Sequence, residues 1–135
     1  MQRPTGTTPA MQITIIEDGI HELCWFSEGN DAIDAWFDYN EALYEQTSPD
    51  DTIRFLHVAQ MAKFPPIAYI SRKARNLQSK YAVQPKTRTA VLFKSVFFGG
   101  FINTLSGLLN RSGQDVTRFF ADDERDKAIA WLIQE

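Results

Sequence analysis

Cysteine, histidine and long apolar runs are scarce in this sequence of 135 residues, which holds one Cys and two His. A single cysteine cannot form an intramolecular disulfide, so we expect a reducing, cytoplasmic location. No run reaches the roughly 18 apolar residues of a membrane-spanning helix, and the N-terminus lacks a signal-peptide pattern. One cysteine and two histidines cannot by themselves complete a typical four-ligand zinc site. We therefore predict no metal and no cofactor.

The motifs of common enzyme classes are also missing. The chain has neither a P-loop nor a dinucleotide-binding fingerprint, although Gly99 and Gly100 lie near an expected helix start. His21 and His57 fall at an expected hairpin and inside an expected strand, with no acid at a diagnostic spacing, which favours structural roles. Cys24 lies in an apolar run, where burial would raise the pKa of its thiol. We predict that the protein is not an enzyme.

Acidic residues are absent from residues 52–114, a stretch that holds ten Lys and Arg. Residues 1–51 hold eleven acids against one base, and residues 115–135 hold six acids and three bases. The three parts therefore carry formal charges of −10, +10 and −3. Such segregation is typical of a basic part that meets an anionic partner, or of two parts that neutralise each other within one molecule.

The composition is that of one globular domain, because 44% of the residues are hydrophobic and 23% are charged. Residues 1–11 include a segment rich in Thr, Pro and Gly, and we interpret them as a flexible leader. The domain then covers residues 12–135.

Alternating and helical spacings predict an α/β domain in the order β-β-α-β-α-β-α-β-α, with one mixed five-stranded sheet whose later strands are parallel. A hairpin turn is expected at 17–19, between the first two strands. The expected strands are 13–16, 20–26, 53–59, 89–93 and 116–120. The expected helices start after Gly29, at Pro65-Pro66, at 98 (ending at 109) and at Asp122-Asp123-Glu124.

Two of these helices carry charge of opposite sign. In the first helix, an apolar side has Ile33, Trp36, Phe37, Leu43 and Tyr44, and an acidic stripe has Asp34, Asp38, Glu41 and Glu45 at steps of 4, 3 and 4. In the second helix, the expected buried side is Ile70, Ala74, Leu77 and Tyr81, while Arg72, Lys73, Arg75 and Lys80 project elsewhere. The last helix is anchored by Ala128, Trp131 and Leu132.

Two segments, 13–23 and 118–132, together with the order of elements between them, resemble the SpoIIAA-like proteins, relatives of the STAS domains and of the CRAL-TRIO lipid carriers. The resemblance covers about residues 12 to 135 and implies a SpoIIAA/STAS-like fold with a regulatory or protein-interaction role. Antagonist STAS domains are switched by a phosphoserine before the second helix. Residues 59–66 occupy that place here and have no hydroxyl side chain, so the switch is not carried over.

Basic side chains give the candidate site for an anion or a partner: Arg72, Lys73, Arg75, Lys86, Arg88 and Lys94. Guanidinium and ammonium groups match phosphate or carboxylate oxygens. The same bases could instead pair with the acidic stripe, which we treat as a candidate interaction face. The pI near 5.4 argues against nucleic acid as the partner.

Two functions stay open from these patterns. The first is a non-enzymatic regulatory or protein-interaction module in which the acidic stripe of one molecule meets a basic surface of another, giving a homo-oligomer or a complex with a charged partner. The second is a carrier of a lipid or other amphipathic anion, held in an apolar cavity near 98–109 with Lys86, Arg88 and Lys94 at its rim.

Overall fold

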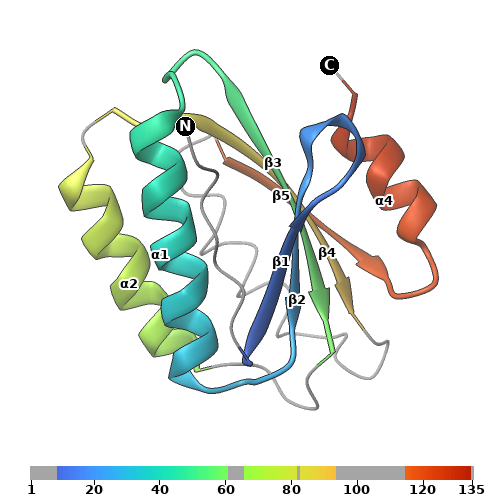
Figure 1. The fold of residues 1–135 in the computed structure, drawn as a ribbon, viewed down its shortest axis with the longest axis horizontal. Helices are drawn as coiled ribbons and strands as arrows, with labels where there is room; N and C mark the ends of the chain where they lie inside the picture. The colour runs from blue at the N-terminus through green and yellow to red at the C-terminus, as the bar shows by residue number, and fades with distance from the viewer. Residues whose placement is uncertain (1–8, 61–65, 82, 94–114, 135) are drawn as a thin grey trace.

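Five strands form one mixed sheet in the spatial order β1-β2-β3-β4-β5 (Figure 1). The structure is a computed structural model, and it describes residues 9–60, 66–81, 83–93 and 115–134. β1 is antiparallel to β2, and β2, β3, β4 and β5 are parallel to one another. The predicted α/β class and the mixed sheet are confirmed. The strands are β1 (Met11–Ile15), β2 (His21–Trp25), β3 (Thr52–Ala59), β4 (Lys86–Phe93) and β5 (Asp115–Ala121).

The first two strands are joined where the sequence predicts a turn. A short 3-10 helix, η1 (Glu17–Gly19), makes the connection, and a backbone hydrogen bond of 2.8 Å from Ile16 N to Ile20 O closes it. Asp18 and Gly19 both have positive φ, at 60° and 72°. Glycine adopts this left-handed conformation without the steric cost of a Cβ atom, which is why the tight connection ends on Gly19.

Helix α1 (Asn30–Gln46) buries the predicted apolar side. Ile33, Phe37 and Leu43 are buried against the sheet, while Trp36 and Tyr44 pack on the same core and are half-buried. The helix starts after Gly29, whose N–H donates to Ser27 Oγ at 3.0 Å. The predicted acidic stripe therefore lies on a side of α1 that does not face the sheet.

Helix α2 (Ile67–Lys80) lies beside α1 (Figure 1). Its N-cap is Pro66, one residue before the first helical position at which we expected a proline. Ile70 and Leu77 are buried, and Ala74 and Tyr81 pack on the same core. The predicted inward side of this helix is confirmed.

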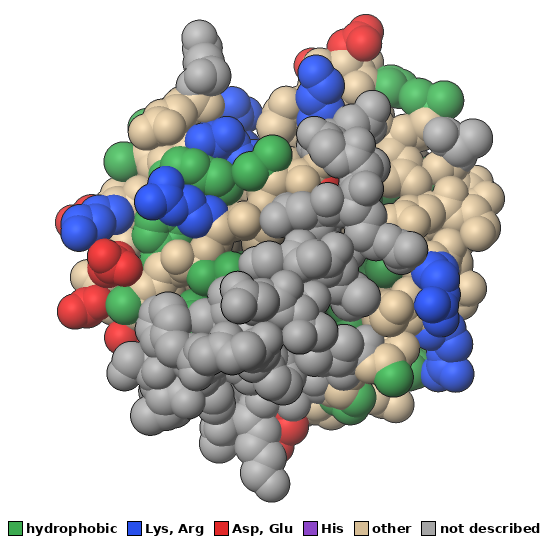
Figure 2. Space-filling model, turned by 180° about the vertical axis from the view of Figure 1, so that it is seen from behind, with side chains coloured by type: hydrophobic (Ala, Val, Ile, Leu, Met, Phe, Trp, Pro, Cys, Tyr) green, Lys and Arg blue, Asp and Glu red, His purple; other side chains and the backbone are tan. Residues whose placement is uncertain are grey.

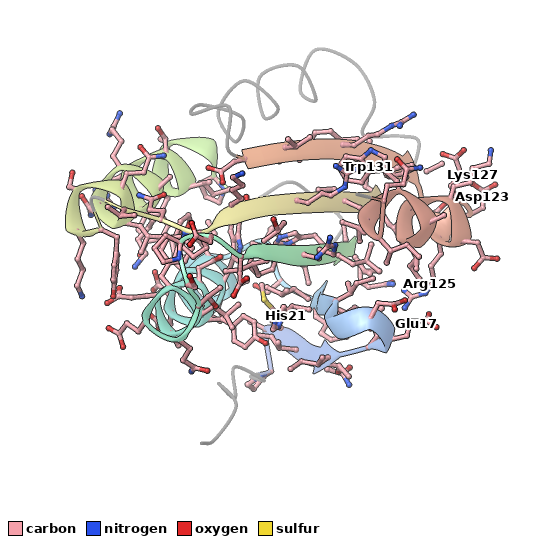
Figure 3. All side chains as sticks on the ribbon, turned by 90° about the horizontal axis from the view of Figure 1, so that it is seen from above. Glu17, His21, Asp123, Arg125, Lys127 and Trp131 are labelled. Carbon is pink, nitrogen blue, oxygen red and sulfur yellow. The ribbon has the colours of Figure 1, made fainter. Side chains whose placement is uncertain are left out.

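Helix α4 (Arg125–Leu132) starts three residues later than the acids of the predicted first turn suggest. The carboxylate of Glu124 accepts the Ala121 N–H at 2.9 Å, so this residue ties the turn before the helix and serves as its N-cap position. Arg125 pairs with Glu22 of β2, and Figure 3 shows Arg125 at the end of the sheet where η1 carries Glu17. Ala128 and Leu132 are buried as predicted.

The helices cover opposite faces of the sheet. α1 and α2 pack on one face with Leu23, Ile53 and Phe55 among others, and α4 packs on the other face over Leu56 and Leu92 (Figures 1 and 3). Two cores, one on each face, thus hold a three-layer arrangement together.

Two further predictions differ from the structure at element ends, and a third falls outside the described residues. β4 begins at Lys86, three residues before the expected start, so Lys86 and Arg88 lie in a strand. β1 begins at Met11, which is fully buried and was assigned to the leader. The expected helix at 98–109 lies outside the described residues.

Candidate functional site

The acidic stripe of α1 faces α2 of the same molecule. The hydroxyl of Tyr69 donates to Asp34 Oδ1 at 2.5 Å, and Lys73 Nζ lies 3.4 Å from the same oxygen. The hydrogen bond from Tyr69, followed by the bond and charge of Lys73, lowers the pKa of Asp34. This carboxylate is thus held by two residues of α2.

The same pattern continues about two and three turns further along α1, at Glu41 and Glu45. Lys80 pairs with Glu41, which raises the pKa of Lys80, and the Tyr81 hydroxyl donates to Glu45 at 2.9 Å. Asp38 is exposed, and no described residue forms an ion pair with it. We call this contact of Asp34, Glu41 and Glu45 of α1 with the Lys and Tyr side chains of α2 and its C-cap, Tyr81, the helix seam.

Arg72 and Arg75 remain on the solvent side of α2. Both are exposed, and neither forms an ion pair with a described residue. The Arg72 guanidinium lies over the ring of Tyr69, 5.0 Å from its centroid. Of the three clustered bases that the sequence singles out on this helix, Lys73 is engaged in the seam and these two face solvent.

The remaining predicted bases lie elsewhere. Lys86 and Arg88 occupy alternate positions of β4, so they share the sheet face that α4 covers. Lys94 lies outside the described residues. On the side of the molecule seen in Figure 2, Lys and Arg side chains form several separate groups. The structure therefore divides the predicted basic site between α2 and the opposite face of the sheet.

Arg88 is directed at α4 together with Arg54, which the sequence analysis did not select. The two residues are register partners in β3 and β4. Arg54 Nε donates to Leu132 O at 2.7 Å, and Arg88 Nε donates to Trp131 O at 2.9 Å. The Arg88 guanidinium also lies 4.0 Å from the centroid of the Trp131 ring. Desolvation and the neighbouring Arg54 lower the pKa of Arg88.

A cavity of about 80 Å³ lies between α1, α2 and the sheet. It combines aromatic walls with the three buried polar side chains of the described core, which are Asn40, His57 and Thr89. Sequence reasoning missed Asn40 and Thr89 and treated His57 as structural. The described lining residues are Trp36, Phe37, Asn40, Tyr44, Phe55, His57, Ala74, Leu77, Gln78, Gln84, Thr87, Thr89, Asp115 and Thr117.

This lining differs from the lipid-carrier cavity expected from the sequence. None of the described lining residues is Lys or Arg. Lys86 and Arg88, two of the three expected rim residues, lie on the other face of the sheet, and 98–109 is outside the described residues.

His57 is held by a buried hydrogen bond. Trp25 Nε1–H donates to His57 Nδ1 at 2.9 Å, and the rings of Trp36 and Phe55 also surround the imidazole. Desolvation lowers the pKa of His57 to about 3. The imidazole is therefore neutral at physiological pH, with its proton on Nε2.

His21 and Cys24, the other two side chains considered for catalysis, are both half-buried. His21 Nδ1 lies 2.6 Å from the Tyr39 hydroxyl, and burial lowers the pKa of this histidine. Burial, followed by the charge of Glu22, raises the pKa of the Cys24 thiol, as the sequence predicts.

Metal and membrane sites can be assessed only for the part of the chain that the structure describes. Within it, no group of three or more His, Cys, Asp or Glu side chains is placed to hold a metal ion. No described helix has the length and apolar character to cross a bilayer. In comparisons with known proteins, the chain matches no family model, no curated protein and no solved structure.

Proposed function

We propose that this protein is a non-enzymatic interaction module that presents the basic outer face of α2 to an acidic protein partner. The non-enzymatic part rests on His21, His57 and Cys24. Burial raises the pKa of the thiol, which disfavours the nucleophilic thiolate, and lowers the pKa of His57 to about 3, far below the pH at which it would exchange protons. Burial also lowers the pKa of His21, whose Nδ1 lies beside the Tyr39 hydroxyl. The resemblance of the sequence to SpoIIAA-like proteins agrees with such a role.

The observation that carries the proposal is the difference among the bases of α2. Lys73 and Lys80 are paired with α1, whereas Arg72 and Arg75 are exposed and form no ion pair with a described residue. Arginine offers five N–H donors in a planar fork that matches carboxylates. Because the helix seam engages most of the acidic stripe internally, the partner binds at Arg72 and Arg75 and not at the stripe.

Charge reversal tests this surface. The double variant Arg72→Glu, Arg75→Glu is compared with Arg118→Glu, Lys127→Glu, which changes the net charge equally at exposed residues of β5 and α4. Affinity capture from extracts of the source cells measures the hetero-complex, and light scattering at low and high salt measures self-association.

We expect an association that weakens with salt, is lost in the α2 variant and is kept in the control. Equal losses in both variants, or an association indifferent to the α2 charges, would contradict the proposal. A complex that forms with pure protein alone identifies a second copy of this chain as the partner.

A further inference from the structure

Three polar side chains are buried in the described core, and all three line the same cavity. Asn40 of α1, His57 of β3 and Thr89 of β4 are 6%, 6% and 8% exposed. Burying polar groups without hydrogen bonds is costly, so such groups normally converge where something satisfies them. Their convergence on one cavity from three elements is the starting point of the inference.

His57 offers this cavity a hydrogen-bond donor. Its Nδ1 accepts the indole N–H of Trp25, a group that can only donate. The ring proton therefore stays on Nε2, and no described residue accepts it. A ligand beside His57 would have to supply an acceptor such as a carbonyl oxygen.

Asn40 and Thr89 supply the complementary groups. Asn40 Nδ2 donates to Trp36 O at 3.0 Å, and because that carbonyl can only accept, the bond fixes the orientation of the amide. Asn40 Oδ1 is left as an acceptor, and Thr89 Oγ1 can both donate and accept. No described residue forms a side-chain hydrogen bond to either atom. The cavity thus holds a donor from His57 and acceptors from Asn40 and Thr89.

Charge and size restrict the occupant further. No described lining residue is a cation, while Asp115 contributes a carboxylate that accepts from Thr87 at 2.7 Å. An anion would therefore find no basic partner among the described lining residues. A volume of about 80 Å³ holds a few water molecules or one small organic group, since one water needs roughly 10–15 Å³ on this measure.

We propose that the cavity binds a small uncharged molecule in which a carbonyl acceptor adjoins an N–H donor, as in an amide or a lactam. The carbonyl accepts from His57 Nε2–H, the N–H donates to Asn40 Oδ1 or Thr89 Oγ1, and the aromatic walls cover the apolar part. This site goes beyond the proposed partner surface and does not depend on it, because Arg72 and Arg75 do not line the cavity.

The probe is 2-pyrrolidone, titrated to about 100 mM into ¹⁵N-labelled protein because ligands this small bind in the millimolar range. The indole N–H of Trp25 and the side-chain amide of Asn40 report on the site by NMR. Pyrrolidinium and butyrate are matched probes of similar size, one cationic and one anionic. We expect saturable shifts with 2-pyrrolidone and none with the two ions.

Thr89→Val removes the hydroxyl at nearly constant shape and should weaken lactam binding about threefold to tenfold, the worth of one hydrogen bond. Thr89→Ser keeps the hydroxyl and should bind as the wild type does. Thr14→Val is the matched control at an exposed position of β1. If the shifts with 2-pyrrolidone do not saturate, the cavity holds water alone and the proposal is overturned. Equal binding of either ion, or equal effects of Thr89→Val and Thr14→Val, overturns it as well.

Discussion

His57 makes the free energy of unfolding depend on pH. In the folded protein its pKa is about 3, against an ordinary value of 6.5. As the pH falls below 6.5, the unfolded chain takes up this proton and the folded protein does not, so protonation favours unfolding. Stability that is fully present above this pH is lost progressively as the pH falls toward 3. At about pH 5 the loss amounts to about 2 kcal/mol relative to about pH 7.5.

Urea unfolding at these two pH values measures the effect. The reference is His57→Gln, which keeps an acceptor for Trp25 Nε1–H and cannot titrate. His21 also has a lowered pKa and contributes with the same sign, so His21→Gln is measured in parallel. Among the other cavity residues, Tyr44 has a pKa raised to about 12 by burial and by Asp115, and stays protonated throughout.

The wild type should lose about 2 kcal/mol more than His57→Gln between the two pH values, and His21→Gln should keep the share of the loss that His57 contributes. A loss that is the same in wild type and His57→Gln would refute the reasoning. An NMR titration of the wild-type imidazoles gives a second readout that needs no variant. A His57 resonance that titrates near pH 6 would refute it equally.

Three smaller changes probe other contacts. Gly19→Ala forces a Cβ into backbone with φ of 72°, and should lower the free energy of unfolding by about 1 kcal/mol in a thermal melt. Arg88→Met removes the bond to the Trp131 carbonyl and the contact with its ring, and should cost about 1 to 3 kcal/mol by urea unfolding. Cys24 should react with a disulfide reagent more slowly than free cysteine at pH 8, and approach the free rate in urea, because burial raises its pKa. An unchanged melting temperature, an unchanged urea midpoint or a rate equal to that of free cysteine would contradict the respective expectation.

Local patterns were enough to predict most of the fold. Helical spacing places Ile70 and Leu77 on the inward side of α2, and the turn residues Asp18 and Gly19 mark the first connection. The exact ends of the helices and strands were harder to predict. The acids before α4 suit a first helical turn, but Glu124 bonds the Ala121 N–H and ends up outside the helix. Such a bond depends on the tertiary course of the turn, which periodicity does not encode.

The sequence showed which charged residues share a side of a helix, but it did not show which residues lie opposite them. Spacing within one helix shows that Asp34 and Glu41 share a side, but it contains no information about which helix lies opposite. In the structure, Lys73 and Lys80 of α2 are their partners. From the sequence alone, pairing within one molecule and pairing between two molecules both stayed open. Arg54 was passed over because its relation to α4 arises from the packing of residues far apart in the chain.

The cavity was beyond the reach of sequence reasoning for the same reason. Asn40, His57 and Thr89 come from a helix and two strands, and no spacing links them. Trp25 fixes the tautomer of His57 across the β2 and β3 pair, a contact that depends on strand register. The one signal in the sequence was His57, a polar residue between the apolar residues Leu56 and Val58.

The contact of Arg54 and Arg88 with the end of α4 has a consequence for behaviour in acid. Both guanidinium groups donate to backbone carbonyls, which gain no proton as the pH falls, and the negative end of the helix dipole favours them. At the other end of α4 the carboxylate of Glu124 accepts the Ala121 N–H, which lowers the pKa of Glu124, and protonation of this carboxylate in acid weakens the bond. Acid therefore loosens this helix from its N-terminal end while its last turn stays fastened to the sheet, so that fraying has a fixed direction.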